Sequence, residues 1–98
     1  MKFGLSQKDI RQILSVFKKN PHVKEVIIFG SRAMGNYKKG SDVDLAIKGK
    51  LNPGELSHLK SVLEEDLPIP YVFDLVEYRE IESPELKDHI DTYGKIFT

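Results

Sequence analysis

The sequence predicts an α+β fold, in which a small mixed β-sheet carries helices mainly on one face. Three apolar segments rich in β-branched residues are typical of strands: VKEVIIFG (23–30), SDVDLAIK (41–48) and PYVFDLVEY (70–78). They alternate with segments whose apolar residues recur at helical spacing. Because 98 residues without an internal repeat or a long linker can bury one modest core, we expect residues 1–98 to form a single domain.

Helices are expected at four places along the chain. Ser6, Asn52 and Ser83 are good N-cap residues, and proline follows the last two at the first helical position. Gly94 is expected to end the last helix. The expected helices cover residues 6–19, 31–37, 52–66 and 83–94. The apolar side chains expected to face inward from the last one are Leu86, Ile90 and Tyr93.

Composition and charge exclude several classes of protein. Lysine plus arginine and aspartate plus glutamate both number 15, so there is no net charge to attract nucleic acid, and we expect no direct nucleic-acid binding. No apolar run approaches the roughly 20 residues of a membrane helix, and the opening MKFGLSQK lacks the apolar core of a signal peptide. The lack of cysteine excludes disulfides and zinc–thiolate sites. We expect a cytoplasmic protein with no membrane partner.

The segment FGSRAMGNYKKGSDVDLAIKG (29–49) carries the main functional pattern. Asp42 and Asp44 are two residues apart on an expected strand, so their carboxylates point to the same face. Two like charges that close repel one another, and a divalent cation relieves the repulsion. Mg²⁺ suits an all-oxygen site that one or two carboxylates share with substrate phosphates. The Gly30-Ser31 turn, between a strand and a helix, offers N–H groups and a hydroxyl to such phosphates.

A third acid is expected beside this pair, because an attacking hydroxyl needs a base and a two-metal site needs another oxygen ligand. Asp74 is the best candidate, since it is the acid that strand-like apolar residues flank on both sides, in YVFDLVEY. If Asp74 is instead a structural strand residue, the third acid is to be sought among Glu77 and its neighbours.

The spacing Gly-Ser-x10-Asp-x-Asp resembles the signature of the DNA polymerase beta-like nucleotidyltransferase superfamily. The elements GSRAMG and SDVDLAI most resemble its minimal nucleotidyltransferase (MNT) branch, which is known for prokaryotic antitoxins encoded beside a HEPN-domain toxin. The resemblance runs from about Val23 to about Tyr78. It implies the palm-like fold of polymerase beta. One departure is Met34, where many relatives carry a second arginine.

The resemblance also implies roles for particular residues. Asp42, Asp44 and Asp74 match the catalytic acids that bind metal, and Gly30 and Ser31 match residues that contact the nucleotide's phosphates. Arg32 fits the same nucleotide-binding pattern, although a surface residue or a salt-bridge partner of an aspartate explains it nearly as well. The implied cofactor is Mg²⁺, as two ions for which Mn²⁺ substitutes, and the implied substrate is ATP. The implied reaction is AMP transfer to a hydroxyl, that of a tyrosine on a cognate HEPN toxin.

Other interpretations remain open at this point. The chain could neutralise a toxin by binding alone, nucleotidylate a small molecule such as an aminoglycoside, or be a regulatory nucleotide-binding domain. Larger relatives have further domains that bind the acceptor, so we expect a partner to complete that side. Ile96 and Phe97 are expected to be exposed and suit an oligomer or partner interface, unless they simply cap the last helix. Residues expected in solvated surface positions outside the site are Lys38, Lys39, His22, His58 and His89.

Overall fold

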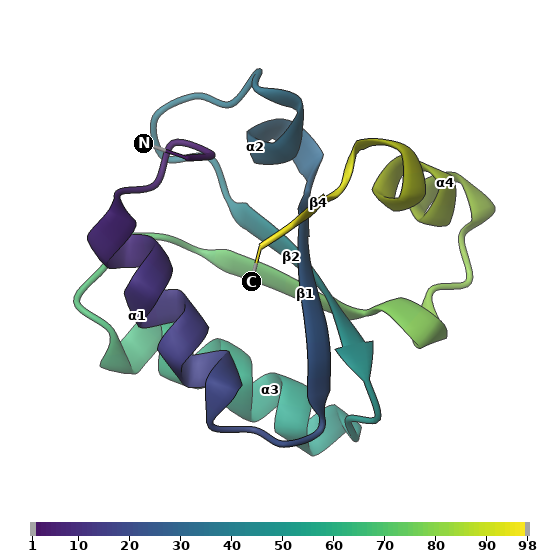
Figure 1. Ribbon diagram of the computed structural model, residues 1–98, viewed down its shortest axis with the longest axis horizontal. Helices are drawn as coiled ribbons and strands as arrows, with labels where there is room; N and C mark the ends of the chain where they lie inside the picture. The colour runs from purple at the N-terminus through teal and green to yellow at the C-terminus, as the bar shows by residue number, and fades with distance from the viewer. Residues whose placement is uncertain (1, 98) are drawn as a thin grey trace.

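The computed structural model describes residues 2–97 and shows one four-stranded mixed sheet with helices packed against it (Figure 1). The strands lie in the order β3-β2-β1-β4. β1 pairs antiparallel with both β2 and β4, whereas β2 and β3 are parallel. The strand bounds are β1 Val23–Phe29, β2 Val43–Gly49, β3 Phe73–Glu77 and β4 Lys95–Ile96. The predicted α+β class with a small mixed sheet is confirmed.

Four α-helices lie where the sequence predicts them, each somewhat shorter than its predicted range. Ser6 caps the first, accepting the Asp9 N–H at 3.0 Å, and Asn52 forms a full capping box with Glu55. Ser83 accepts the Leu86 N–H at 3.2 Å. The bounds are α1 Gln7–Lys18, α2 Gly30–Met34, α3 Pro53–Ser61, continued by a π-helical turn (η1) over Val62–Asp66, and α4 Pro84–Tyr93; a 3₁₀ turn (η2) covers Tyr78–Glu80. Within residues 2–97, the helices are too short or too polar to traverse a lipid bilayer.

The alternation of side chains along β2 divides the molecule into two layers of packing. Val43, Leu45 and Ile47 are fully buried on one face, in the main core that α1, α3 and η1 cover. Ala46 lies on the other face, in a smaller cluster with Ile90 of α4. Burying each large aliphatic side chain contributes about 1.5–3 kcal/mol, so the α1–α3 side holds most of the stabilisation. The α4 side is only partly covered, and Asp44 lies on it.

Several local predictions differ from the structure. β2 begins at Val43, so Asp42 precedes the strand, and the predicted strand 70–78 shortens to β3. The expected helix 31–37 ends at Met34 because Gly35 takes a left-handed φ of 85°. β4 is not predicted from the sequence, because its two residues are too few to show an alternating pattern.

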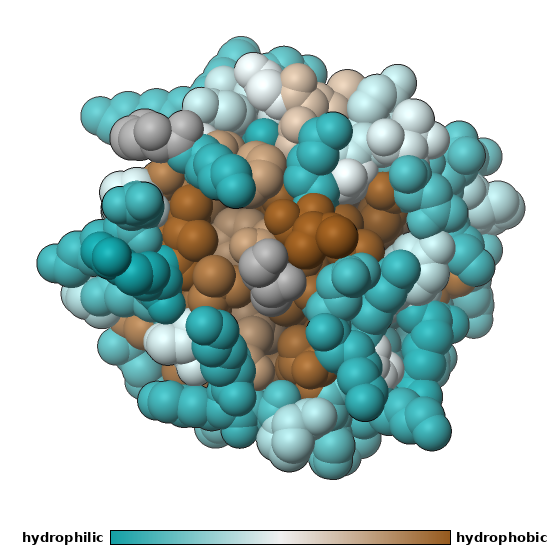
Figure 2. Space-filling model, viewed as in Figure 1, coloured by the Kyte–Doolittle hydropathy of each residue, from teal (hydrophilic) through white to brown (hydrophobic). Residues whose placement is uncertain are grey.

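For three residues near the C-terminus, the exposure of the side chain can be compared with its prediction. Phe97 is buried and packs against Phe3 with ring centroids 6.1 Å apart, so the expectation that it is exposed is wrong. Ile96 is 60% exposed, as expected. Tyr93, expected to face inward, is 47% exposed. Figure 2 shows hydrophobic residues gathered at the centre of the face that carries β4, with hydrophilic residues around them.

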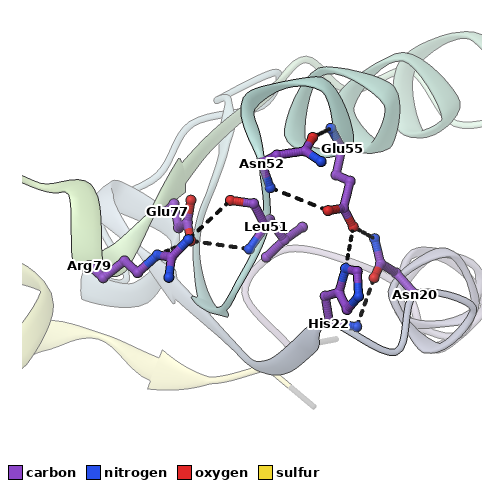
Figure 3. Close-up of polar contacts among 7 residues, drawn as sticks. All are labelled: Asn20, His22, Leu51, Asn52, Glu55, Glu77 and Arg79. Carbon is purple, nitrogen blue, oxygen red and sulfur yellow. Dashed lines mark hydrogen bonds and ion pairs between the residues drawn. The ribbon is translucent and has the colours of Figure 1, made fainter.

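Polar contacts fasten the end of the sheet where β1 begins and β2 ends (Figure 3). Glu55 of α3 accepts hydrogen bonds from Asn20 and His22 at 3.0 and 2.8 Å, which ties the α1–β1 loop to α3. At the end of β3, the buried Glu77 accepts the Leu51 N–H at 3.2 Å and pairs with Arg79 at 2.6 Å. Both carboxylates are therefore occupied by structural contacts.

Candidate active site

Strand directions bring the separate motifs of the sequence to the other end of the sheet. β1 ends at Phe29, which pairs with Asp44 near the start of the antiparallel β2. β3 runs parallel to β2, so its start lies at the same end, and Asp74 pairs directly with Asp44. Gly30, which follows Phe29 in the chain, therefore lies beside the acids. The structure thus assembles the Gly-Ser turn and all three predicted acids at one edge.

The three carboxylates lie close enough to influence one another electrostatically. Asp44 and Asp74 share a face of the sheet on strands that run about 4.8 Å apart. Asp42 and Asp74 are exposed, whereas Asp44 is half-buried. Burial, followed by the charges of Asp74 and Asp42, raises the pKa of Asp44 to about 6, although Arg32 and His89 act in the opposite direction. The site therefore holds excess negative charge that a cation would relieve.

The donor set fits a hard cation that keeps much of its coordination open. Carboxylate oxygens are the ligands that Mg²⁺ takes from proteins, usually one or two together with water and phosphate. Within the described part of the chain, no three acidic or histidine side chains are arranged as a complete metal-binding group. A metal held here would thus take its remaining oxygens from water or from a ligand. That requirement suits a cation that arrives with, or is completed by, a phosphate-bearing substrate.

Gly30 occupies a position that no other residue fits without strain. Its φ is +72°, in the left-handed region, and a Cβ there would overlap Oδ2 of Asp44. Its N–H donates to Nε2 of His89 at 3.0 Å. Ser31 follows as the second residue of α2, in the first turn, where backbone N–H groups have no partner within the helix. The turn therefore places Gly30 against Asp44, and Ser31 follows it directly in the chain.

Arg32 is buried, with 3% of its surface exposed. Its guanidinium donates twice to the carbonyl of Ser41, at 3.1 and 2.7 Å, and once to that of Phe3, at 2.8 Å. It lies between the rings of Tyr37 and Tyr71, at 5.5 and 5.1 Å from their centroids. A surface position is excluded, and the predicted nucleotide contact stays a prediction. In this structure Arg32 fixes the backbone that leads directly into Asp42.

Basic residues gather beside this arginine. Lys38 and Lys39 are exposed, as predicted, and line a surface pocket of about 350 Å³ together with Arg32 and Tyr37. A more apolar pocket of about 340 Å³ lies between α1 and α3 and contains none of the predicted site residues. The predicted site residues therefore lie at the same end of the sheet as the pocket lined by the two lysines. The pocket between α1 and α3 is remote from them.

His89 also lies at this edge of the sheet, where it was not predicted. It was expected to be a surface histidine, but it bonds the Gly30 N–H and lies near enough to Asp44 to affect its pKa. Its ring packs edge-on against Phe29, with centroids 6.1 Å apart. The sequence does contain a signal for this position, because residue 89 lies on the same inward face of α4 as Leu86 and Ile90, which recur at helical spacing.

Comparison with known proteins agrees with this fold. A mixed sheet with a Gly-Ser turn beside paired aspartates is the arrangement that the resemblance to the nucleotidyltransferases implies. Residues 11–98 match the family described as "Polymerase beta, Nucleotidyltransferase". The chain therefore belongs to the polymerase beta-like nucleotidyltransferase family. No curated protein matches the chain.

Solved structures of MNT antitoxin pairs are similar to this chain over nearly its whole length. A chain in the crystal structure of a toxin–antitoxin with AMP-PNP has 26% identity and a TM-score of 0.73, with 96% of this chain and 73% of that chain covered. A chain in the structure of a tri-AMPylated Shewanella oneidensis HEPN toxin in complex with MNT antitoxin has 23% identity and a TM-score of 0.71. The match covers 96% of this chain and 72% of that chain. A structure described as a "putative minimal nucleotidyltransferase" has 24% identity and a TM-score of 0.72, with 97% of this chain and 95% of that chain covered. The resemblance to the MNT branch is confirmed at the level of fold.

Proposed function

We propose that this chain is a single-domain, Mg²⁺-dependent nucleotidyltransferase that transfers AMP from ATP to a hydroxyl, that of a tyrosine on a cognate HEPN toxin. The observation that carries the proposal is the meeting of Gly30-Ser31 with Asp42, Asp44 and Asp74 at one edge of the sheet. Burial, followed by repulsion from Asp74 and Asp42, raises the pKa of Asp44, so an uncompensated group of three acids at this edge is unfavourable and a metal ion would relieve it.

Each residue has a defined part in this reaction. Asp42, Asp44 and Asp74 would hold two Mg²⁺ ions, for which Mn²⁺ substitutes, and the metal supplies neutralisation of the triphosphate and of the leaving pyrophosphate. Ser31 and the Gly30 turn bind and orient the phosphates. The acceptor oxygen attacks the α-phosphorus, the bond to pyrophosphate breaks, and Asp74, exposed at the rim, accepts the hydroxyl proton.

The antitoxin role is supported by the solved relatives. At 26% identity, the similar chain comes from a toxin–antitoxin that binds an ATP analogue, AMP-PNP. The fold is shared with the MNT antitoxin that was solved in complex with a tri-AMPylated toxin. A nucleotide site and a toxin partner are therefore combined in relatives of this fold, and we extend both to this chain.

The decisive experiment assays the toxin after it has been separated from this chain. The partner is co-expressed with the native chain, with Asp42→Ala/Asp44→Ala or with the surface control Glu82→Gln, and is then purified alone. We expect AMP-sized mass increments on a tyrosine and lasting inactivity from the native chain and the control, because a covalent product survives dissociation. The double variant should yield active, unmodified toxin. Active, unmodified toxin from the native co-expression would instead indicate inhibition by occlusion.

A further inference from the structure

His89 holds one of the N–H groups that a phosphate-binding turn would offer its ligand. The Gly30 N–H donates to His89 Nε2 at 3.0 Å, although the two residues are 59 positions apart. The imidazole is itself held in place, by edge-on packing against Phe29 and by contact with Tyr93, whose ring centroid lies 5.4 Å away. The acceptor is therefore presented by a ring that α4 and β1 fix together.

Gly30 is confined on its opposite side by Asp44. A Cβ at position 30 would overlap Oδ2 of that carboxylate, so the backbone of the turn touches the proposed metal ligand. Gly30 thus lies between an imidazole that holds its N–H and a carboxylate that touches its Cα. If the hydrogen bond were lost, a glycine with a left-handed φ would leave the turn free to rotate away from the acids.

We infer that His89 is a positioning residue for the phosphate-binding turn. By accepting the Gly30 N–H, it holds the turn against Asp44 and leaves the Ser31 hydroxyl and N–H as the groups that meet phosphate. Nucleotide binding then costs less free energy for ordering the turn, because the turn already has its binding geometry in the free protein. The inference rests on the proposed nucleotide site and adds α4 to it.

A direct test of the hydrogen bond is the scalar coupling between the Gly30 amide nitrogen and His89 Nε2 in the ¹⁵N-labelled full chain. The coupling should be present in the free protein and should persist after Mg²⁺ and AMP-PNP are added. Its absence in the free protein would overturn the inference. Its disappearance on nucleotide binding would do so too, because phosphate would then take the Gly30 N–H from His89.

Matched variants test whether the bond matters for binding. His89→Phe keeps the ring packing but removes the acceptor, whereas His89→Gln supplies a carbonyl acceptor at similar reach. The Kd for AMP-PNP with Mg²⁺, measured by calorimetry, should rise about 3- to 10-fold in His89→Phe and stay within about twofold of native in His89→Gln. His58→Phe, an exposed histidine of α3, controls for loss of a histidine elsewhere and should bind as the native chain does.

The outcomes separate this inference from the proposed function. Native affinity in His89→Phe, or equal weakening in His89→Gln, would overturn the positioning role while leaving the nucleotide site in place. A native chain that shows the coupling but binds no nucleotide would overturn the proposed function, and the inference with it. Thermal melts identify a His89→Phe chain that fails to fold, and His89→Leu then takes its place as the variant without an acceptor.

Discussion

Replacing Asp44 with asparagine should stabilise the metal-free protein at neutral pH. The pKa of Asp44 rises from 3.8 to about 6 on folding, so the folded state holds a proton between these values that the unfolded state has lost. Stability from this group is therefore full below about pH 4, falls as pH rises, and is lowest above about pH 6. Asparagine stays neutral throughout and avoids the loss.

The size of the effect follows from the shift. About two pKa units correspond to about 3 kcal/mol, and solvent screening at this half-buried site reduces the figure to about 1–2 kcal/mol. Above pH 7, Asp44→Asn should therefore raise Tm by about 4–8 °C for each kcal/mol gained. The same variant should lose the thermal shift that the proposed binding of Mg²⁺ with ATP is expected to give the native chain.

Urea or thermal melts from pH 3 to pH 8 measure the prediction as a difference between variant and native chain. The difference should be close to zero at pH 3 and should grow between about pH 4 and 6. Glu82→Gln removes an exposed carboxylate and should show no such growth. A gain that is equal at both ends of the range, or an Asp44→Asn chain less stable than native at pH 8, would refute the electrostatic reasoning.

Three further predictions concern the turn, the buried arginine and the third acid. Gly40→Ala should lower the free energy of unfolding by about 1–2 kcal/mol because of its left-handed φ alone, since a Cβ there meets open space. In urea melts, Gly30→Ala should lower it further, because a Cβ at position 30 overlaps Asp44. Adding Asp44→Ala to Gly30→Ala should recover part of this additional loss. Arg32→Lys should destabilise the chain by about 1–3 kcal/mol, because one ammonium cannot replace a guanidinium that binds two carbonyls at once; an unchanged melt would contradict this. Asp74→Asn should lower AMP transfer about 10²–10⁴-fold in a labelled-ATP assay at unchanged Tm, and retained activity would exclude it as the base.

Local signals along the chain are enough to locate most of the secondary structure and the main motif. Capping residues, proline positions and apolar periodicity are local signals, so the four helices and three of the strands could be located from short windows. The Gly-Ser turn and Asp-x-Asp pair also lie within one short segment. For that reason, Gly30, Ser31, Asp42 and Asp44 could be grouped before any tertiary contact was known.

Tertiary structure decided which distant residues join that segment. Asp74 meets Asp44 because β3 pairs with β2 in parallel and in this register, whereas Glu77, three residues further along β3, faces away and binds Arg79. His89 reaches Gly30 because α4 packs on the partly covered face, and Arg32 is buried because the Phe3 and Ser41 carbonyls converge on it. These contacts depend on strand order and helix docking, which arise from burial summed over the whole chain and leave no mark in a local window.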